Sequence, residues 1–209
     1  MKILGISGSP RKKGSTAELV KTVLDASGHE TEFVSLGGKR IGPCIFCLAC
    51  AKDNVCKVKD GMADLREKIV EADGLVVGGC NMWSTVNGLT HNFLERFFQF
   101  HHQGASPLMG KPVAAVGVGG ADGTAPINAM EPMLRDFGLH LVGSVSAQGA
   151  FACYSCGLGN SCDISLVCGL DENGEIDAAC KPDLQKQPLV LKDARRLGSA
   201  LGEAVDAAV

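Results

Sequence analysis

Along this chain, short apolar runs alternate with segments whose apolar residues recur every three or four positions. Short runs are typical of buried strands, and the wider spacing is typical of helices with one buried face. The runs predict five strands, at 2–7, 31–36, 74–79, 112–120 and 140–147. The periodic segments predict five helices, at 15–27, 62–72, 89–100, 125–138 and 188–209. Ser15 and Glu18 have the spacing of a capping box, and Pro132 is expected to interrupt the fourth helix.

This alternation predicts an α/β fold whose parallel sheet is covered on both faces. Five strands and five helices in this order favour a doubly wound five-stranded sheet of the flavodoxin type, in which ligands bind at the carboxyl ends of the strands. The length of 209 residues fits a single domain spanning 1–209. Two cysteine-rich insertions depart from the pattern, a loop at 43–57 and an irregular segment at 149–182 before the last helix.

Composition and charge argue against several classes of protein. The formal net charge is −3, and the dense basic run Arg11-Lys12-Lys13 is short, so we expect no nucleic-acid partner. No apolar run approaches the roughly 18 residues that span a bilayer, and the N-terminus does not have the pattern of a secretory signal. We therefore expect a cytoplasmic protein without membrane association. Ten cysteines are many for a reducing compartment, where disulfides are rare, and this favours metal or cluster ligation.

The segment SGSPRKKGST, residues 7–16, leads from the first strand into the first helix. Its small residues allow backbone N–H groups to converge on an anion at a helix N-terminus. Side-chain donors are available from Ser9, Arg11, Ser15 and Thr16. The glycine spacing excludes a Walker loop, and the dinucleotide fingerprint is absent. The segment predicts a phosphate site, with an ordinary solvated turn as the alternative.

Four cysteines form the pattern C-x2-C-x2-C-x5-C, at Cys44, Cys47, Cys50 and Cys56. Steps of three residues bring thiolates together around one corner of an iron–sulfur cluster, and the nearby fourth cysteine favours a single [4Fe–4S] centre. A structural zinc site more often pairs two knuckles across a longer spacer, and disulfides fit neither the spacing nor the compartment. Zinc and disulfides remain the alternatives.

A second cysteine group, Cys153, Cys156, Cys162 and Cys168, is followed by Cys180. The spacing C-x2-C-x5-C-x5-C predicts a second cluster or a zinc ion, which would order a segment that has few large apolar residues. The alternative is that these thiols line an oligomer interface or have no common role.

Three stretches in matching order, KILGISGSPRKKGST, GCNMWSTVNGLTHNFLERF and AVGVGGADG, resemble the flavin-contact regions of the NADPH-dependent FMN reductase-like group of flavodoxin-like proteins. With CIFCLACAKDNVC, the resemblance narrows to the iron–sulfur flavoproteins, over roughly residues 1–150 and the last helix. It implies FMN and a [4Fe–4S] cluster as cofactors. In this family the cluster of one subunit lies near the flavin of another, which implies a homodimer or tetramer.

The resemblance also implies which residues contact the flavin. The phosphate would be held by Ser9, Arg11, Gly14, Ser15 and Thr16. The isoalloxazine ring would lie along Asn81, Met82, Trp83, Ser84 and Thr85, and its pyrimidine edge along Gly119, Gly120 and Asp122. The family usually has proline followed by an aromatic residue in the second region, so stacking would fall here to Trp83 or Met82.

These features predict a flavin-dependent oxidoreductase that transfers electrons. Electrons would come from a reduced carrier such as ferredoxin, pass through cluster and FMN, and leave to a small acceptor such as dioxygen, peroxide or a quinone. We expect no triad or general base, because the redox chemistry belongs to the cofactors. The alternatives are an NAD(P)H-dependent FMN or quinone reductase with structural zinc, a redox-sensing binding protein, and a reductase of organic substrates.

Overall fold

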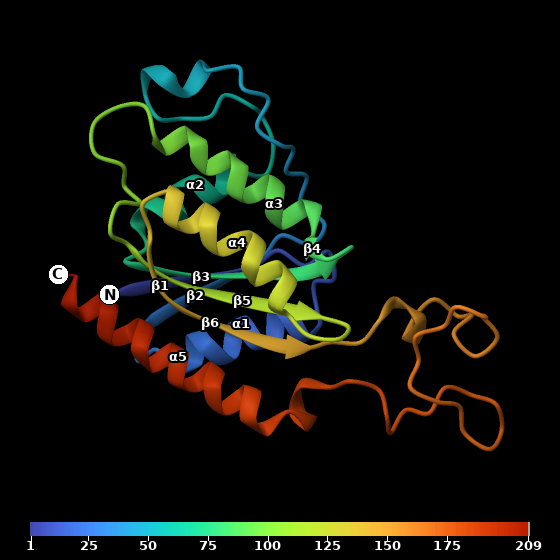
Figure 1. The fold of residues 1–209 in the computed structure, drawn as a ribbon. Helices are drawn as coiled ribbons and strands as arrows, with labels where there is room; N and C mark the ends of the chain where they lie inside the picture. The colour runs from blue at the N-terminus through green and yellow to red at the C-terminus, as the bar shows by residue number, and fades with distance from the viewer. Residues whose placement is uncertain (209) are drawn as a thin grey trace.

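The computed structural model describes residues 1–208, in which a parallel sheet lies between two layers of helices (Figure 1). The strands are β1 Lys2–Ser7, β2 Glu30–Ser35, β3 Gly74–Met82, β4 Thr85–Val86, β5 Pro112–Gly119 and β6 His140–Gln148. The α-helices are α1 Ser15–Asp25, α2 Ala63–Glu71, α3 Gly88–Glu95, α4 Thr124–Asp136 and α5 Pro188–Ala207. Four 3₁₀ helices complete the elements: η1 Ala49–Lys52, η2 Arg96–Phe100, η3 Ala152–Tyr154 and η4 Leu184–Lys186.

The five long strands have the order β2-β1-β3-β5-β6 and are all parallel, and the two-residue β4 pairs antiparallel with the end of β3. With β4 set aside, this is the flavodoxin-like strand order, so the predicted fold class is confirmed. The order places β1, β3 and β5 side by side in the centre. The loops that follow these three strands therefore lie along one edge of the sheet.

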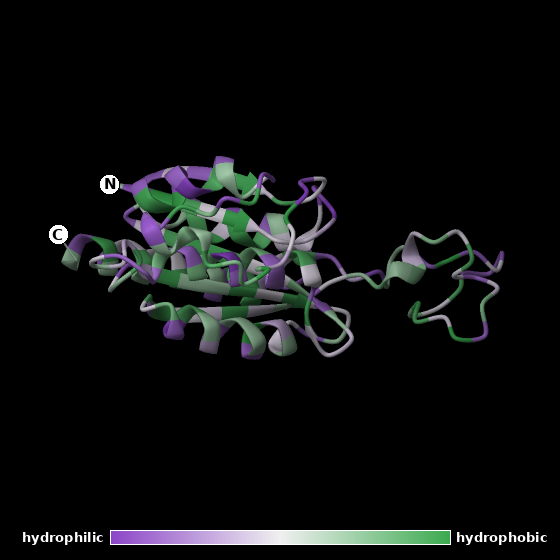
Figure 2. Ribbon diagram, turned by 90° about the horizontal axis from the view of Figure 1, so that it is seen from above, coloured by the Kyte–Doolittle hydropathy of each residue, from purple (hydrophilic) through white to green (hydrophobic). Residues whose placement is uncertain are grey.

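Each face of the sheet has its own hydrophobic core. Successive side chains of a strand point to opposite faces, so Ile3 joins the core under α1 and α5, whereas Leu4 and Ile6 join the core under α2, α3 and α4. Figure 2 shows the strands in largely hydrophobic colours and hydrophilic positions on the outer sides of the helices. Helix α5 approaches the end of α1 closely, because a Cβ at Gly198 would meet the carbonyl oxygen of Val23.

Two predictions about the ends and the continuity of helices are wrong. Helix α1 begins at Ser15, but its N-cap is Gly14 and no side chain caps it, so the predicted capping box is wrong. Helix α4 continues through Pro132 without a break. Pro132 and Asn128 both lie on the exposed side of α4, so the carbonyl that loses its helical partner can face water.

The two cysteine-rich segments lie apart from each other. The loop at 43–57 packs on the outer side of α3, whereas the segment at 149–182, hereafter the appendage, projects beyond the carboxyl end of β6 (Figures 1 and 2). The appendage is mostly irregular apart from η3. Among residues 1–208, no helix is both long enough and apolar enough to cross a membrane.

Candidate functional site

The three stretches expected to contact flavin follow neighbouring strands. In the sheet, Ser7 of β1 pairs with Gly78 of β3, and Cys80 of β3 pairs with Val118 of β5. Residues 8–14, 81–85 and 119–123 therefore meet at the carboxyl edge, where doubly wound sheets bind ligands.

The loop after β1 offers an anion site at the N-terminus of α1. Ser9 and Thr16 are buried there, Ser15 is half-buried, and the first turn has no side-chain cap. Uncapped N–H groups at a helix start attract a negative charge. The guanidinium of Arg11 is exposed and donates to the carbonyl of Ala150 at 3.4 Å, which links the loop to the root of the appendage.

A buried asparagine fixes this loop relative to the end of β3. The Asn87 side chain donates to the Gly8 carbonyl at 2.8 Å and accepts from the Cys80 N–H at 3.1 Å. The Thr90 hydroxyl donates to the same amide oxygen of Asn87 at 2.7 Å. The Cys80 thiol lies nearby, and burial raises its pKa although a hydrogen bond from Ser9 acts in the opposite direction.

The ring-contact stretch forms a tight hairpin, which the sequence analysis missed. Met82 pairs with Thr85 across a two-residue turn, and both turn residues are left-handed, with φ of 55° at Trp83 and 63° at Ser84. Left-handed turns of this length normally use asparagine and glycine, and other residues cost roughly 1–2 kcal/mol each. The Asn81 side chain accepts the Ser84 N–H at 3.0 Å. Trp83, at the tip, is 93% exposed.

The loop after β5 is closely packed. A Cβ at Gly119 would meet the carbonyl oxygen of Asp122, and one at Gly120 would overlap the ring of Phe151. The Asp122 carboxylate accepts the Thr124 N–H at 2.8 Å, and this bond lowers its pKa. Asp122 thus stabilises the start of α4, a role the sequence analysis did not assign to it.

The loop at 43–57 is anchored by three side chains from one helical segment. Glu95 at the end of α3 accepts the Cys44 N–H at 3.1 Å, and Gln99 of η2 accepts the Cys56 N–H at 3.0 Å. Between them, Arg96 donates to the Cys56 sulfur at 3.2 Å. Three non-glycine residues of the loop are left-handed, Phe46, Leu48 and Asn54. Such backbone persists only where the surroundings hold it.

Arg96 is a buried cation beneath this loop. Its side chain is 1% exposed and forms an ion pair with Asp60 at 2.6 Å, and it also donates to the Gly42 carbonyl at 3.1 Å. Burial alone would raise the pKa of Asp60, but hydrogen bonds from Arg96 and from the backbone N–H groups of Gly42 and Met62 lower it. Burial alone would lower the pKa of Arg96, but hydrogen bonds to Asp60 and to the Cys56 sulfur outweigh this effect and raise the pKa, so the guanidinium stays charged.

The four loop cysteines interact electrostatically. Burial raises the pKa of the Cys50 thiol most, and Cys56, Cys44 and Cys47 raise it further because like charges repel. Among the described residues, no three Cys, His, Asp or Glu side chains are grouped as a metal site. The ligand set Cys44, Cys47, Cys50 and Cys56 thus stays a prediction.

The second cysteine group is arranged differently from its predicted pattern. Cys168 forms a disulfide with Cys180, whereas Cys153, Cys156 and Cys162 carry free thiols. A cysteine in a disulfide offers no thiolate to a metal, so the predicted ligand set is wrong for Cys168 in this structure. Spacing alone cannot show that the nearest partner of Cys168 in space lies after it in the chain.

Comparison with known proteins identifies the family. A family model described as NADPH-dependent FMN reductase matches residues 1–152, which include all three flavin-contact stretches and the four loop cysteines. The chain belongs to this family. This confirms the family expected from the sequence, and it supports the expected class, a flavin-dependent oxidoreductase.

Curated relatives and a solved structure are similar to this member of the FMN reductase family. An iron–sulfur flavoprotein of Methanocaldococcus jannaschii is 38% identical over 99 residues, which are 46% of this chain and 51% of the relative. One of Clostridioides difficile is 29% identical over 158 residues, 72% of this chain and 69% of the relative. The chain spans about half the length of most curated relatives it matches. RosB with a bound intermediate has a TM-score of 0.68 at 16% identity, covering 99% and 79% of the two chains, which shows a shared fold.

Family membership supports FMN as the cofactor, and the carboxyl edge fits its phosphate. Besides the uncapped start of α1 and the buried hydroxyls of Ser9 and Thr16, Ser7 has a buried oxygen with no hydrogen-bond partner among the described residues. An orphaned hydroxyl beside a helix N-terminus suits an anion with several acceptor oxygens. The thiols of the loop at 43–57 likewise have the donor chemistry that iron requires.

Several residues of the site escaped the sequence analysis. No local pattern marks Asn87, Arg96 and Gln99, because each contacts a loop that is 40 or more positions away in the chain. The one available signal was an arginine inside the aromatic helical stretch ERFFQF. Charged residues are almost never buried without a partner, and here the partner is Asp60.

Proposed function

We propose that this chain is an iron–sulfur flavoprotein that carries FMN at the carboxyl edge of the sheet and a [4Fe–4S] cluster on Cys44, Cys47, Cys50 and Cys56. The observation that carries the proposal is the anchoring of the cysteine loop, where a buried guanidinium meets the Cys56 sulfur. Asp60 already compensates the charge of Arg96, so the second contact of the guanidinium, to the Cys56 sulfur, provides a charged hydrogen-bond donor where an anionic thiolate–iron group would lie.

When bound, FMN supplies two-electron and one-electron redox chemistry and the cluster supplies one-electron chemistry. The residues of this chain bind and orient the two groups. The start of α1 and Arg11 would hold the flavin phosphate, and Asn87 keeps the first two loops in register. Glu95 and Gln99 fix the backbone at Cys44 and Cys56, so these ligands start from a defined geometry.

We further propose that electrons arrive from a reduced carrier such as ferredoxin and leave to a small acceptor such as dioxygen, peroxide or a quinone. A homodimer or tetramer is part of this proposal. The cysteine loop is anchored to α3 and η2, and its apolar side chains Ile45, Phe46 and Leu48 are exposed. Exposed apolar clusters of this kind favour contact with another protein surface.

Anaerobic purification followed by metal, sulfide and FMN analysis tests the proposal. We expect roughly four irons per chain and a broad absorbance shoulder near about 400 nm that bleaches on reduction. Cys50→Ser should lose the iron and keep FMN, whereas the matched variant Cys80→Ser, outside the loop, should keep both. Zinc without iron in the wild type, or full iron content in Cys50→Ser, would contradict the cluster. Rapid reduction of the flavin by NADPH would instead support a direct NAD(P)H donor.

A further inference from the structure

The appendage carries a disulfide on a loop that has its own backbone bonds. Cys168 and Cys180 are 12 positions apart, with Cα atoms 5.9 Å from each other. Between them, Leu170 and Ile176 form an antiparallel bridge, and the Asp177 N–H donates to the Gly169 carbonyl at 3.1 Å. Because these bonds hold the loop independently, the disulfide can open without dismantling it.

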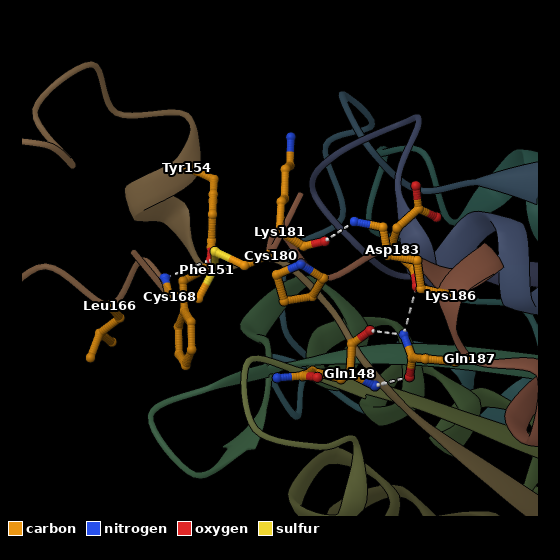
Figure 3. Close-up of a pocket in the computed structure, with 11 residues that line it drawn as sticks. Gln148, Phe151, Tyr154, Leu166, Cys168, Cys180, Lys181, Asp183, Lys186 and Gln187 are labelled. Atoms are coloured by element: carbon orange, nitrogen blue, oxygen red, sulfur yellow. Dashed lines mark hydrogen bonds between the residues drawn. A yellow bond between two sulfur atoms is a disulfide. The ribbon is translucent and has the colours of Figure 1, made fainter. Parts of the chain in front are cut away.

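The disulfide lines a small cavity between the appendage and the end of β6. The cavity has a volume of about 250 Å³, and both sulfur-bearing residues form part of its wall, together with Phe151, Tyr154 and Gln148 (Figure 3). Its opposite wall comes from the segment that leads into α5. A reagent the size of a single amino acid could reach the disulfide from this side, whereas pockets for larger ligands usually exceed about 300 Å³.

Tyr154, the only tyrosine of the chain, is fixed against one of the two sulfurs. Its hydroxyl donates to the Cys168 sulfur at 2.8 Å and accepts the Cys168 N–H at 2.8 Å (Figure 3). A disulfide sulfur is a weak acceptor, but a thiolate is a strong one, so this O–H···S bond strengthens when Cys168 is released. Thiol–disulfide exchange is faster when the leaving thiolate is stabilised. The phenol therefore makes Cys168 the leaving sulfur and Cys180 the sulfur that is attacked.

The charged side chains that line the cavity favour one kind of attacking thiol. Lys181 and Lys186 line it against a single carboxylate, Asp183. Lys186 is held in place because its ammonium donates to the Ala179 carbonyl at 2.5 Å and to the Lys181 carbonyl at 3.3 Å. The four carboxylates between the two cysteines, Asp171, Glu172, Glu175 and Asp177, are not among the lining residues. The balance at the cavity wall itself therefore favours a reagent that carries negative charge besides its thiolate.

We propose that Cys168 and Cys180 form a thiol–disulfide exchange site whose substrate is a small thiol bearing a carboxylate. The substrate thiolate bonds to the Cys180 sulfur while the Cys168–Cys180 bond breaks, and Cys168 leaves as a thiolate hydrogen-bonded to Tyr154. A second substrate thiolate attacks the substrate sulfur of the mixed disulfide and releases Cys180. Two electrons pass from two thiols to the disulfide, which yields one substrate disulfide and two cysteine thiols after protonation. This inference does not depend on the cluster or on FMN.

The test follows opening of the disulfide by alkylation and mass spectrometry in the full-length protein. N-acetylcysteine and its uncharged amide are the probes, with rates expressed per thiolate. We expect the charged probe to react faster, and Lys181→Gln to remove most of that preference. Tyr154→Phe removes the hydroxyl that donates to the Cys168 sulfur and keeps the ring. It should slow opening of the disulfide about fivefold to tenfold, because the leaving thiolate loses one hydrogen bond. Cys162→Ser, a matched change at an exposed cysteine of the same segment, should leave the rate unchanged.

The Cys50→Ser background separates this inference from the proposed cluster, because thiol chemistry in the appendage can be measured without iron. Unchanged far-ultraviolet circular dichroism shows that each variant is folded. Equal rates for wild type and Tyr154→Phe would overturn the role of the phenol and with it the site. A protein whose Cys168 and Cys180 cannot be linked by mild oxidation, or whose appendage cysteines retain zinc or iron in Cys50→Ser, would overturn the site as well.

Discussion

Removing the charges of Asp60 and Arg96 together should destabilise the protein less than the sum of the two separate removals. The pair is buried, with side chains 11% and 1% exposed, and is joined by two hydrogen bonds of 2.6 and 3.2 Å. Asp60→Asn leaves the guanidinium without a counter-ion, and Arg96→Met leaves a carboxylate in the same position. Breaking a buried pair on one side typically costs about 3–5 kcal/mol, because an uncompensated charge stays out of water.

The double variant Asp60→Asn/Arg96→Met should cost less than the sum of the two single variants by at least about 1.5 kcal/mol, because it removes both buried charges. Guanidinium unfolding of the reduced, metal-free forms, followed by far-ultraviolet circular dichroism, gives these free energies. Lys57→Gln is the matched control, since it breaks an exposed ion pair with Asp53 whose side chains are 47% and 48% exposed. Exposed pairs contribute roughly 0–1 kcal/mol, so this variant should be nearly neutral.

The dependence of the Asp60 effect on pH follows from the sign of its shift. The lowered pKa of Asp60 means that its charged form stabilises the fold above the ordinary carboxyl pKa, and this contribution is lost as pH falls through the lowered value. The difference in unfolding free energy between wild type and Asp60→Asn should therefore shrink in acid. A cost below about 1 kcal/mol for Arg96→Met at neutral pH, or strict additivity, would refute the reasoning.

Three further outcomes are expected. Burial lowers the pKa of Lys111 to about 8. Above that pH the folded protein binds fewer protons than the unfolded chain at this position. The free energy of unfolding of the wild type, measured in urea relative to Lys111→Met, should therefore rise between pH 8 and about 10. Gly120→Ala would push a methyl group into the Phe151 ring and should speed proteolysis of the appendage several-fold, unlike Gly169→Ala, whose added methyl meets open space. Thr16→Val removes a buried hydroxyl at the start of α1 and should weaken FMN binding about tenfold by fluorescence titration, with riboflavin much less affected.

The alternation of strands and helices was sufficient to predict the layered fold, because each element must bury one face against its neighbour. The finer boundaries were not predictable in the same way. The β3–β4 hairpin depends on left-handed backbone at Trp83 and Ser84, which is atypical for both residue types. Pro132 is tolerated within α4 because the position faces solvent, and the local sequence does not show which side of a helix will be exposed.

For the candidate site, sequence spacing located the cysteine loop and the phosphate loop, since both depend on residues close together in the chain. It could not supply the contacts that hold them. Arg96 reaches Cys56 from 40 positions away, and Asn87 reaches Gly8 from 79 positions away. Such partners are decided by how α3 packs on the sheet. The same limit explains why the spacing of the second cysteine group suggested a metal and not a disulfide.

The hairpin tip gives the protein a built-in optical reporter. Trp83 is the sole tryptophan and is 93% exposed beside the carboxyl edge, so the tryptophan emission of the whole chain comes from one indole in water. A molecule that settles on that edge, whether a flavin, a carrier protein or a second copy of the chain, would change the surroundings of this indole. Its emission wavelength and quenching would then register the encounter without any added label.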